Sequence, residues 1–259
     1  MGDILDKFIA AAKENVACGY YNKRERFEGK RISMRQRLDE AGFLLITEIK
    51  HASPAGEYSF DNIDVEKAAA DFRRCGSDAI SVVVEPQIFR GRLENVATAK
   101  KASGLPVLFK DFVISSAQIE AAARVGADAV LLVVKVSDRL GLDLDAHIAE
   151  AHGRGLEVLL EAYDADEMKR AMRTDADMLG INNRDLTTLK VDLGRTKSIM
   201  EAAGELDRPV ISESGIKSGK EVEYVKKCGA SGVLVGTAIW KAKDLREKVK
   251  DLKSGAVSV

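Results

Sequence analysis

The chain has 259 residues, of which 46% are hydrophobic, a composition typical of a globular protein. Its 40 lysines and arginines nearly balance 41 aspartates and glutamates, so no nucleic-acid partner is expected. Cys18, Cys75 and Cys228 lie far apart, which excludes a disulfide framework and the paired spacing of a zinc site. The longest apolar run, 127–134, is too short to span a bilayer. We therefore expect a cytoplasmic protein with no membrane partner, no metal and no cofactor.

The N-terminal segment, residues 1–43, precedes the first expected strand. Apolar residues between Ile4 and Val16 recur with helical spacing, which predicts one helix, and a second helix is expected over 34–41. These helices either close the bottom of the fold or edge the mouth of an active site, and the sequence favours neither interpretation.

Eight short apolar segments then recur at the spacing of strand–helix units. Most are continuously apolar, as strands covered on both faces are, and helical patterns lie between them. Eight units in about 250 residues predict an α/β fold, a (β/α)8 TIM barrel over 44–259 with an N-terminal helical extension, forming one domain over 1–259. A doubly wound open sheet is the alternative, but the sequence has no GxGxxG turn. The expected strands are 44–50, 78–84, 106–110, 127–134, 156–161, 177–182, 209–214 and 232–236.

A glycine motif recurs where a helical pattern gives way to an expected strand. Its three copies are Gly76-Ser77-Asp78, Gly126-Ala127-Asp128 and Gly229-Ala230-Ser231. The glycine suits the left-handed conformation just past a helix C-terminus. The motif is explained by the similar helix-to-strand connections, which favour similar residues. Duplication of an ancestral half-barrel would produce the same repetition and stays open.

Ionisable and polar residues collect at the C-terminal ends of the expected strands, where barrels of this kind carry their chemistry. Period-two alternation places Glu48 and Lys50 on one face of the first strand, which we expect to face the lumen. The opposite ends show no matching charges, so a purely structural network is the less favoured interpretation. The other strands end with Lys110, Glu161, Asn182, Arg184, Glu213 and Ser214.

The last two strands end in residues that suit a phosphate site. The seventh expected strand ends at Ser214-Gly215, and the eighth ends at Gly236-Thr237. Glycines let backbone N–H groups approach an anion, and barrel enzymes commonly bind phosphate at these two strands. The alternative is that the glycines serve only tight turns.

Four motifs resemble those of the indole-3-glycerol phosphate synthase family of tryptophan biosynthesis. They are EIKHASP at 48–54, LFKDF at 108–112, GINNRDL at 180–186 and SESGI at 212–216. The motifs occur in the family's order, and the resemblance runs over nearly the whole chain. It implies a carboxy-lyase that closes the indole ring of 1-(2-carboxyphenylamino)-1-deoxyribulose 5-phosphate, with loss of carbon dioxide and water.

The resemblance also implies residue roles. Lys110 would be the general acid toward the ribulose carbonyl or hydroxyl, and Glu161 would take the proton that leaves during dehydration. Lys50 would hold the substrate carboxylate or phosphate and share the acid role, and the division between the two lysines stays open. Glu48 and Asn182 would position these groups, and Ser214 completes the catalytic set. The substrate-binding set is Ser53, Phe89, Phe112, Leu131, Arg184, Leu186, Glu213, Gly215, Gly236 and Thr237.

The residue types suit this chemistry. Ring closure needs a proton donor near the carbonyl, and a lysine whose pKa is lowered by a second cation donates near neutral pH. Arg184 offers a fork for a carboxylate, and the four apolar residues of the binding set suit an aromatic slot. One departure from the family concerns the loop after Ser53-Pro54, which continues Ala55-Gly56-Glu57. A loop hydroxyl is missing there, and an acidic side chain lies near an anionic substrate.

Two other classes of function remain open. One is another phosphosugar-barrel enzyme, such as an aminoaldose–aminoketose isomerase, but those use a Cys/Asp pair and no expected strand here ends in cysteine. The other is a non-catalytic barrel that binds a phosphorylated metabolite, against which the intact catalytic set argues. The expected partner is a small phosphorylated substrate, with the protein a monomer or weakly associated with other tryptophan-pathway enzymes.

Overall fold

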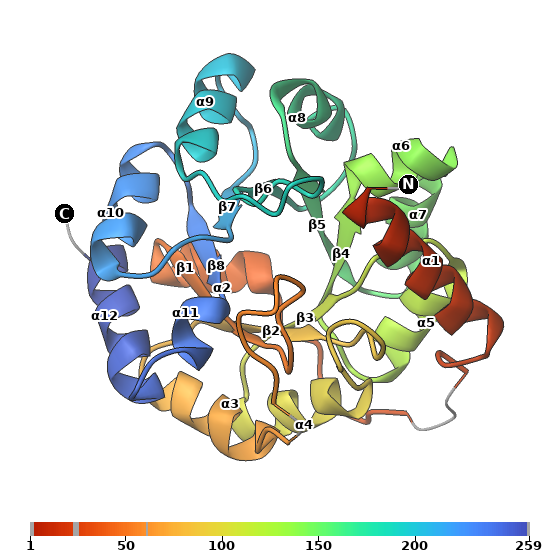
Figure 1. Cartoon of the computed structure of the whole chain (residues 1–259), viewed down its shortest axis with the longest axis horizontal. Helices are drawn as coiled ribbons and strands as arrows, with labels where there is room; N and C mark the ends of the chain where they lie inside the picture. The colour runs from red at the N-terminus through yellow and green to blue at the C-terminus, as the bar shows by residue number, and fades with distance from the viewer. Residues whose placement is uncertain (1–2, 23–25, 61, 258–259) are drawn as a thin grey trace.

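A computed structural model describes residues 3–22, 26–60 and 62–257. Within these ranges eight parallel strands form a closed barrel in chain order, because β1 pairs with both β2 and β8 (Figure 1). The predicted (β/α)8 barrel is thereby confirmed, and the open sheet is excluded. The strands are β1 (Leu44–Ile49), β2 (Ala79–Val83), β3 (Val107–Lys110), β4 (Ala129–Val133), β5 (Glu157–Ala162), β6 (Met178–Asn182), β7 (Val210–Glu213) and β8 (Gly232–Val235).

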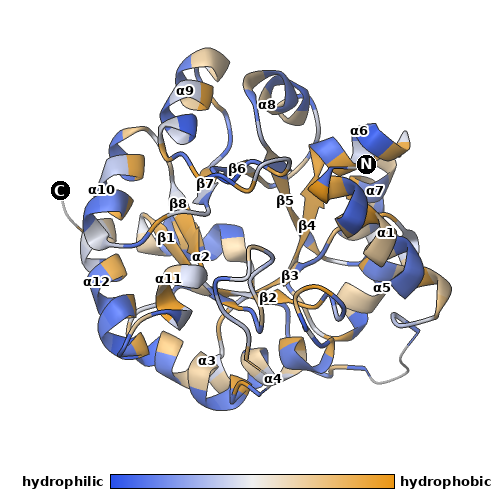
Figure 2. Ribbon diagram, viewed as in Figure 1, coloured by the Kyte–Doolittle hydropathy of each residue, from blue (hydrophilic) through white to orange (hydrophobic). Residues whose placement is uncertain are grey.

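Helices surround the ring of strands in Figure 1, with their hydrophilic faces outward in Figure 2. The helical patterns of the sequence correspond to real helices between the strands. The helices are α1 (Ile4–Ala17), α2 (Met34–Ala41), α3 (Val65–Arg74), α4 (Glu94–Ser103), α5 (Ser116–Arg124), α6 (Val134–Leu140), α7 (Leu144–Gly153), α8 (Ala165–Ala171), α9 (Gly194–Ala203), α10 (Gly219–Lys227), α11 (Thr237–Trp240) and α12 (Leu245–Val257).

Two apolar cores lie on the two faces of the strands. Along β1, Leu45 and Ile49 belong to the outer core between strands and helices, while Leu44 and Ile46 belong to the inner core of the barrel. Glu48 continues the inward-facing series, as the period-two alternation predicts. Because both faces are covered, β1 is buried along its whole length, which explains why it carries apolar residues on both faces.

The expected strands run a few residues too far at some ends. Asp78 was placed in a strand, but its side chain instead accepts the backbone N–H of Leu45 at 3.0 Å. Ser214 was placed at the end of the seventh strand, but its φ of 67° is incompatible with extended backbone. The strand propensity of a segment predicts neither a side chain that accepts a backbone N–H, as at Asp78, nor a residue with positive φ, as at Ser214.

The recurring glycine motif has a structural explanation. Gly76, Gly126 and Gly229 have φ of 96°, 90° and 97°, as expected for residues just past a helix. The polar residue two positions later then accepts a backbone N–H at the start of the preceding strand. These contacts are Asp78 to Leu45 at 3.0 Å, Asp128 to Val107 at 2.8 Å and Ser231 to Val210 at 3.4 Å, and Asp177 makes the same contact to Val158 at 2.7 Å.

The expectation that the N-terminal ends of the strands lack charges is wrong. Asp128 is buried there and pairs with the buried Lys100 at 2.5 Å, while Asp78 pairs with Lys253 at 2.6 Å. The lysines lie on α4 and α12, far from these aspartates in the sequence. The residues at each strand end therefore do not reveal that the aspartates are paired. These carboxylates are structural, because each also accepts a backbone N–H of a strand.

The two N-terminal helices cover opposite ends of the barrel, so each of the two interpretations holds for one helix. At the N-terminal end, α2 is docked by Met34, whose N–H donates to Glu157 of β5 at 2.7 Å, and by Ile32, whose N–H donates to Asp128 at 2.7 Å. At the C-terminal end, α1 is docked by Asn15, which donates to Glu85 just beyond β2 at 3.1 Å. The helical N-terminal extension is thus confirmed.

Across the described residues, every helix is too short or too polar to cross a membrane.

We predict that Asp128→Ala destabilises the fold by about 3 kcal/mol, because Lys100 would stay buried without its partner and two backbone N–H groups would lose their acceptor. Urea unfolding followed by circular dichroism measures the change. The matched control is Asp39→Ala, at a side chain that is 65% exposed, with an expected change within about 0.5 kcal/mol. Equal effects of the two substitutions would contradict the structural role of Asp128.

Candidate active site

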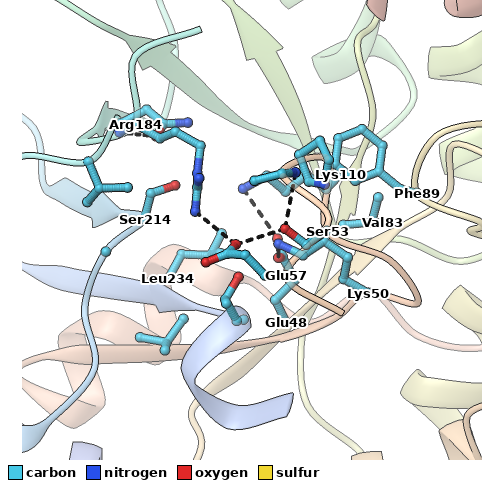
Figure 3. A pocket seen from close by; sticks show the side chains of 18 of the residues that line it. Glu48, Lys50, Ser53, Glu57, Val83, Phe89, Lys110, Arg184, Ser214 and Leu234 are labelled. Carbon is cyan, nitrogen blue, oxygen red and sulfur yellow. Dashed lines mark hydrogen bonds and ion pairs between the residues drawn. The ribbon is translucent and has the colours of Figure 1, made fainter. Parts of the chain in front are cut away.

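Lys110, the last residue of β3, lies at the centre of a charged network in the mouth of the barrel. Its Nζ is 2.7 Å from Glu213 Oε2 on β7 and 3.4 Å from Glu48 Oε2 on β1. Lys50 Nζ, just beyond β1, lies 2.7 Å from the other oxygen of Glu48. Figure 3 shows both lysines directed at Glu48. The carboxylate of Glu48 therefore bridges the two ammonium groups.

The electrostatics of this network correct one expectation. Burial favours the neutral amine of Lys110, but the carboxylates of Glu213, Glu48 and Glu161 outweigh burial and raise its pKa above the usual value. The sequence-based expectation of a lysine whose pKa is lowered by a second cation is wrong, because the acidic partners are closer. Burial likewise disfavours ionised Glu48, yet Lys50 and Lys110 lower its pKa to about 2. Near neutral pH the site holds a charged Lys110 beside a charged Glu48.

Glu161, on β5, forms a second cluster with Tyr163 and Asn182. The Tyr163 hydroxyl makes a short hydrogen bond to Glu161 Oε1, and Asn182 Nδ2 donates to Glu161 Oε2 at 3.1 Å. Burial and the nearby Glu213 carboxylate raise the pKa of Glu161 to about 8, although Lys110, Tyr163 and Asn182 act in the other direction. Glu161 therefore binds its proton more tightly than an ordinary carboxyl group and titrates within about one pH unit of neutrality.

These groups open into a cavity of about 730 Å³. The cavity collects the sequence-predicted residues, with Glu213 as the exception. Glu213 is fully buried beneath Lys110, so it contacts the lysine and is not exposed to the cavity. The predicted residues that line it are Glu48, Lys50, Lys110, Glu161, Asn182, Ser214, Ser53, Phe89, Phe112, Leu131, Arg184, Leu186, Gly215, Gly236 and Thr237.

An apolar slot forms one side of the cavity. The rings of Phe8 and Phe112 stack with centroids 4.7 Å apart, and Phe89 lies 5.6 Å from Phe8. Leu131 and Leu186 complete this wall. Sequence reasoning included Phe8 in the apolar stripe of the first helix but missed it as a cavity residue, because the stripe does not say which end of the barrel the helix covers.

Two acidic residues hold α1 over this slot. Glu85 accepts from Asn15, and Asp111 accepts from the Tyr21 hydroxyl at 2.6 Å. Burial raises the pKa of Asp111 to about 6 against the hydrogen bonds from Tyr21 and Gln118. Both acids line the cavity, but they are bonded to the N-terminal segment and to backbone N–H groups, so they serve to position Phe8.

Tight backbone turns and a glycine without a side chain follow β7 and β8. Ser214 and Gly215 both have positive φ, at 67° and 84°, which turns the chain sharply after β7. Gly236 lies beside Glu48, and a Cβ there would be only 2.4 Å from Glu48 Oε1. Gly236 therefore has a role that the sequence did not reveal, which is to leave room for the carboxylate.

Three lysines that sequence reasoning missed, Lys217, Lys241 and Lys248, line the cavity at the same end. They lie in the loop after β7 and in the segment after β8. The sequence contains many lysines, and only the fold shows which ones converge.

The loop after β1 crosses the mouth of the barrel (Figure 1). Glu57, the departure noted in the sequence, accepts from the Ser53 hydroxyl at 2.8 Å and lies 3.4 Å from Arg184 (Figure 3). The Glu57 carboxylate thus pairs with the guanidinium of Arg184, the group that is predicted to bind a substrate carboxylate.

The described part of the chain contains no group of three or more histidine, cysteine, aspartate or glutamate side chains that could hold a metal ion.

Fold and site together define a (β/α)8 barrel with a buried lysine–glutamate network at the end where enzymes of this fold carry their active sites. A family model for indole-3-glycerol phosphate synthase matches residues 5–252. Proteins of that name from Bacillus cereus and Bacillus anthracis are each 36% identical over 256 residues, covering 98% of this chain and 99% of theirs. The chain belongs to the indole-3-glycerol phosphate synthase family, as its four motifs predicted.

A solved structure agrees at the level of the fold. Thiamine phosphate pyrophosphorylase from Pyrococcus furiosus matches with a TM-score of 0.62 and 19% identity, covering 86% of this chain and 98% of that one. At this identity the likeness concerns the barrel alone.

We predict that Gly236→Ala keeps the barrel folded but lowers turnover by about a hundredfold, since the new Cβ displaces the Glu48 carboxylate from between the two lysines. The backbone of Gly236, with φ −120°, admits alanine, so the effect is on the neighbour. Steady-state kinetics and circular dichroism test this. Gly153→Ala, where a Cβ meets nothing within 4 Å, is the control and should match the parent enzyme.

Proposed function

We propose that the chain catalyses the synthesis of indole-3-glycerol phosphate from 1-(2-carboxyphenylamino)-1-deoxyribulose 5-phosphate, by ring closure with loss of carbon dioxide and water. The observation that carries the proposal is Lys110 held between Glu213 and Glu48, 2.7 and 3.4 Å away, on the floor of a cavity with an aromatic wall. The enzyme would act in the cytoplasm on a small phosphorylated substrate, as a monomer or in weak association with other enzymes of tryptophan synthesis.

In this proposal Lys110 is the principal general acid. Its raised pKa keeps Lys110 protonated near neutral pH but also holds the proton tightly, so the proton passes to the ribulose carbonyl oxygen only as negative charge develops there when the aromatic ring attacks. The same ammonium stabilises negative charge that develops on that oxygen. After carbon dioxide leaves, Lys50 protonates the departing hydroxyl, because Lys110 has already given its proton to that oxygen, and Glu161 accepts the proton that is lost as the indole forms.

The two ends of the cavity match the two ends of the substrate. The wall formed by Phe8, Phe89 and Phe112 suits the aromatic ring, because the three packed rings present aromatic surface to one side of the cavity. The glycine turns after β7 and β8, with Lys217 and Lys241 beside them, suit the phosphate. Arg184 or Lys50 would take the carboxylate until it leaves as carbon dioxide.

The decisive test of this function is a fluorescence assay for indole-3-glycerol phosphate, with purified protein, the carboxyphenylamino-deoxyribulose phosphate and EDTA. We expect product with the parent chain and a loss of at least about a hundredfold with Lys110→Met, since removal of a general acid typically costs this much. Lys197→Met, at a side chain that is 57% exposed on α9, is the matched control. Substrate binding by calorimetry without product would instead favour a non-catalytic barrel.

The loop contact gives a separate prediction. Glu57→Gln should lower KM by about threefold and leave kcat unchanged, because the neutral side chain no longer competes with the substrate for Arg184, and exposed ion pairs are worth under about 1 kcal/mol. Steady-state kinetics at low and high salt measure the change, which should shrink as salt screens the pair. Glu66→Gln, on the exposed first turn of α3, is the control. A rise in KM would show that Glu57 helps to bind the substrate.

A further inference from the structure

The phenol of Tyr163 lies in the acid–base centre although none of the sequence motifs contains it. Tyr163 follows β5 directly, is 4% exposed and lines the cavity. Its hydroxyl donates to Glu161 Oε1 and accepts from Asn182 Nδ2 at 3.1 Å. The same amide nitrogen is 3.1 Å from Glu161 Oε2. The three side chains therefore close a triangle in which each oxygen of Glu161 meets a donor.

Contacts outside the cavity fix Tyr163 in this place. Its backbone N–H donates to Glu167 Oε2 on α8 at 2.8 Å. Lys135 on α6 lies over the phenol ring, 5.4 Å from its centroid, and 3.5 Å from Glu167 Oε1. A ring held by two helices needs little reordering to keep its hydroxyl on Glu161.

The surroundings of Glu161 explain why such a donor matters. The charged groups that influence Glu161 and its neighbours are Glu213 from β7 and Lys110 from β3, with Glu48 of β1 beyond Lys110. Glu213 opposes a second negative charge, and Lys110 is shared among the carboxylates. The hydrogen bonds from Tyr163 and Asn182 favour the ionised form of Glu161 against burial and Glu213. Tyr163 keeps its own proton, since burial and Glu161 raise the pKa of its phenol.

We propose that Tyr163 is a positioning residue for the reaction, whose hydroxyl fixes the rotamer of Glu161 and keeps its carboxylate available as the proton acceptor. This inference rests on the proposed function, because it gives Glu161 the role of base. The contribution of Tyr163 passes through Glu161, and it requires no contact between the phenol and the substrate.

The test compares Tyr163→Phe with the parent enzyme in two measurements. Removal of the O–H donor should raise the pKa of Glu161 from about 8 by about one pH unit, because a hydrogen bond to a charged group is lost. The first measurement is a carbon-13 NMR titration of the Glu161 carboxyl in the ligand-free protein, assigned by the signal missing in Glu161→Gln. The second is the pH profile of kcat/KM, whose rising limb should move upward by the same amount.

The direction of the change separates this role from a structural one. The activity of Tyr163→Phe should be about tenfold low at pH 7 and return toward the parent value at high pH, where Glu161 is ionised in both proteins. The control is Tyr20→Phe, which removes a hydroxyl bonded to the Val84 carbonyl at 2.9 Å and should leave the Glu161 titration unchanged. If Tyr163→Phe folds poorly, 3-fluorotyrosine at position 163, a more acidic phenol, should lower the pKa of Glu161 instead.

The outcomes are distinguishable from those of the proposed function. An unshifted or lowered Glu161 titration in Tyr163→Phe overturns the proposal, whatever the activity. Activity that stays low at all pH values with an unshifted titration assigns Tyr163 a packing role and overturns it as well. A parent enzyme that makes no indole product overturns the proposed function, while the NMR titration still decides whether Tyr163 governs Glu161.

Discussion

One ammonium group, that of Lys110, makes the charged centre of this barrel possible. Glu48 and Glu213 are almost completely buried, and the ammonium of Lys110 is within ion-pair distance of both, so it is the cation that the two buried carboxylates share. Lys110 lies 2.7 Å from one and 3.4 Å from the other, and it also favours ionisation of Glu161. Burial, followed by the nearby Glu213 carboxylate, raises the pKa of Glu161, and within the described residues Glu161 has no lysine in direct contact to offset them.

The barrel geometry places these groups together without long-range adjustment. Glu48, Lys110, Glu161 and Glu213 come from β1, β3, β5 and β7, and alternate strands of a (β/α)8 barrel contribute the side chains of one layer. Glycines beside the layer then make space for it. A Cβ at Gly180 of β6 would be 2.8 Å from Glu213, and one at Gly236 after β8 would be 2.4 Å from Glu48. The layer therefore depends on missing side chains as much as on those present.

The sequence predicted the parts of this arrangement that follow from periodicity and order. Period two placed Glu48 in the lumen, and strand ends identified Lys110, Glu161 and Asn182. What it could not predict are contacts between segments far apart in the chain. Phe8 reaches the aromatic slot because Tyr21 and Asn15 anchor α1 to Asp111 and Glu85, and no local pattern reports such docking. The expectation of a catalytic lysine with a lowered pKa does not hold for Lys110 for the same reason, since the direction of its pKa shift depends on how near Glu213 lies.

Charge at a strand end is by itself a poor indicator of chemistry, because both ends of this barrel carry it. The partners of each carboxylate distinguish the two ends. Asp78, Asp128 and Asp177 accept backbone N–H groups at the strand starts, and a carboxylate so bound cannot turn away without leaving a backbone N–H without its acceptor. Glu85 and Asp111 line the cavity but are bound in the same way.

Glu48, Glu161 and Glu213 are instead bonded to the side chains of lysine, tyrosine and asparagine, which have rotamers and protons of their own. Glu48 and Glu161 line the cavity, so their hydrogen bonds can be exchanged for bonds to a substrate with the backbone left intact, whereas Glu213 lies beneath Lys110 and holds it in place. Among the buried acids that line one cavity, those bonded only to side chains are therefore the candidates for proton transfer, and those that also accept backbone N–H groups are the scaffold.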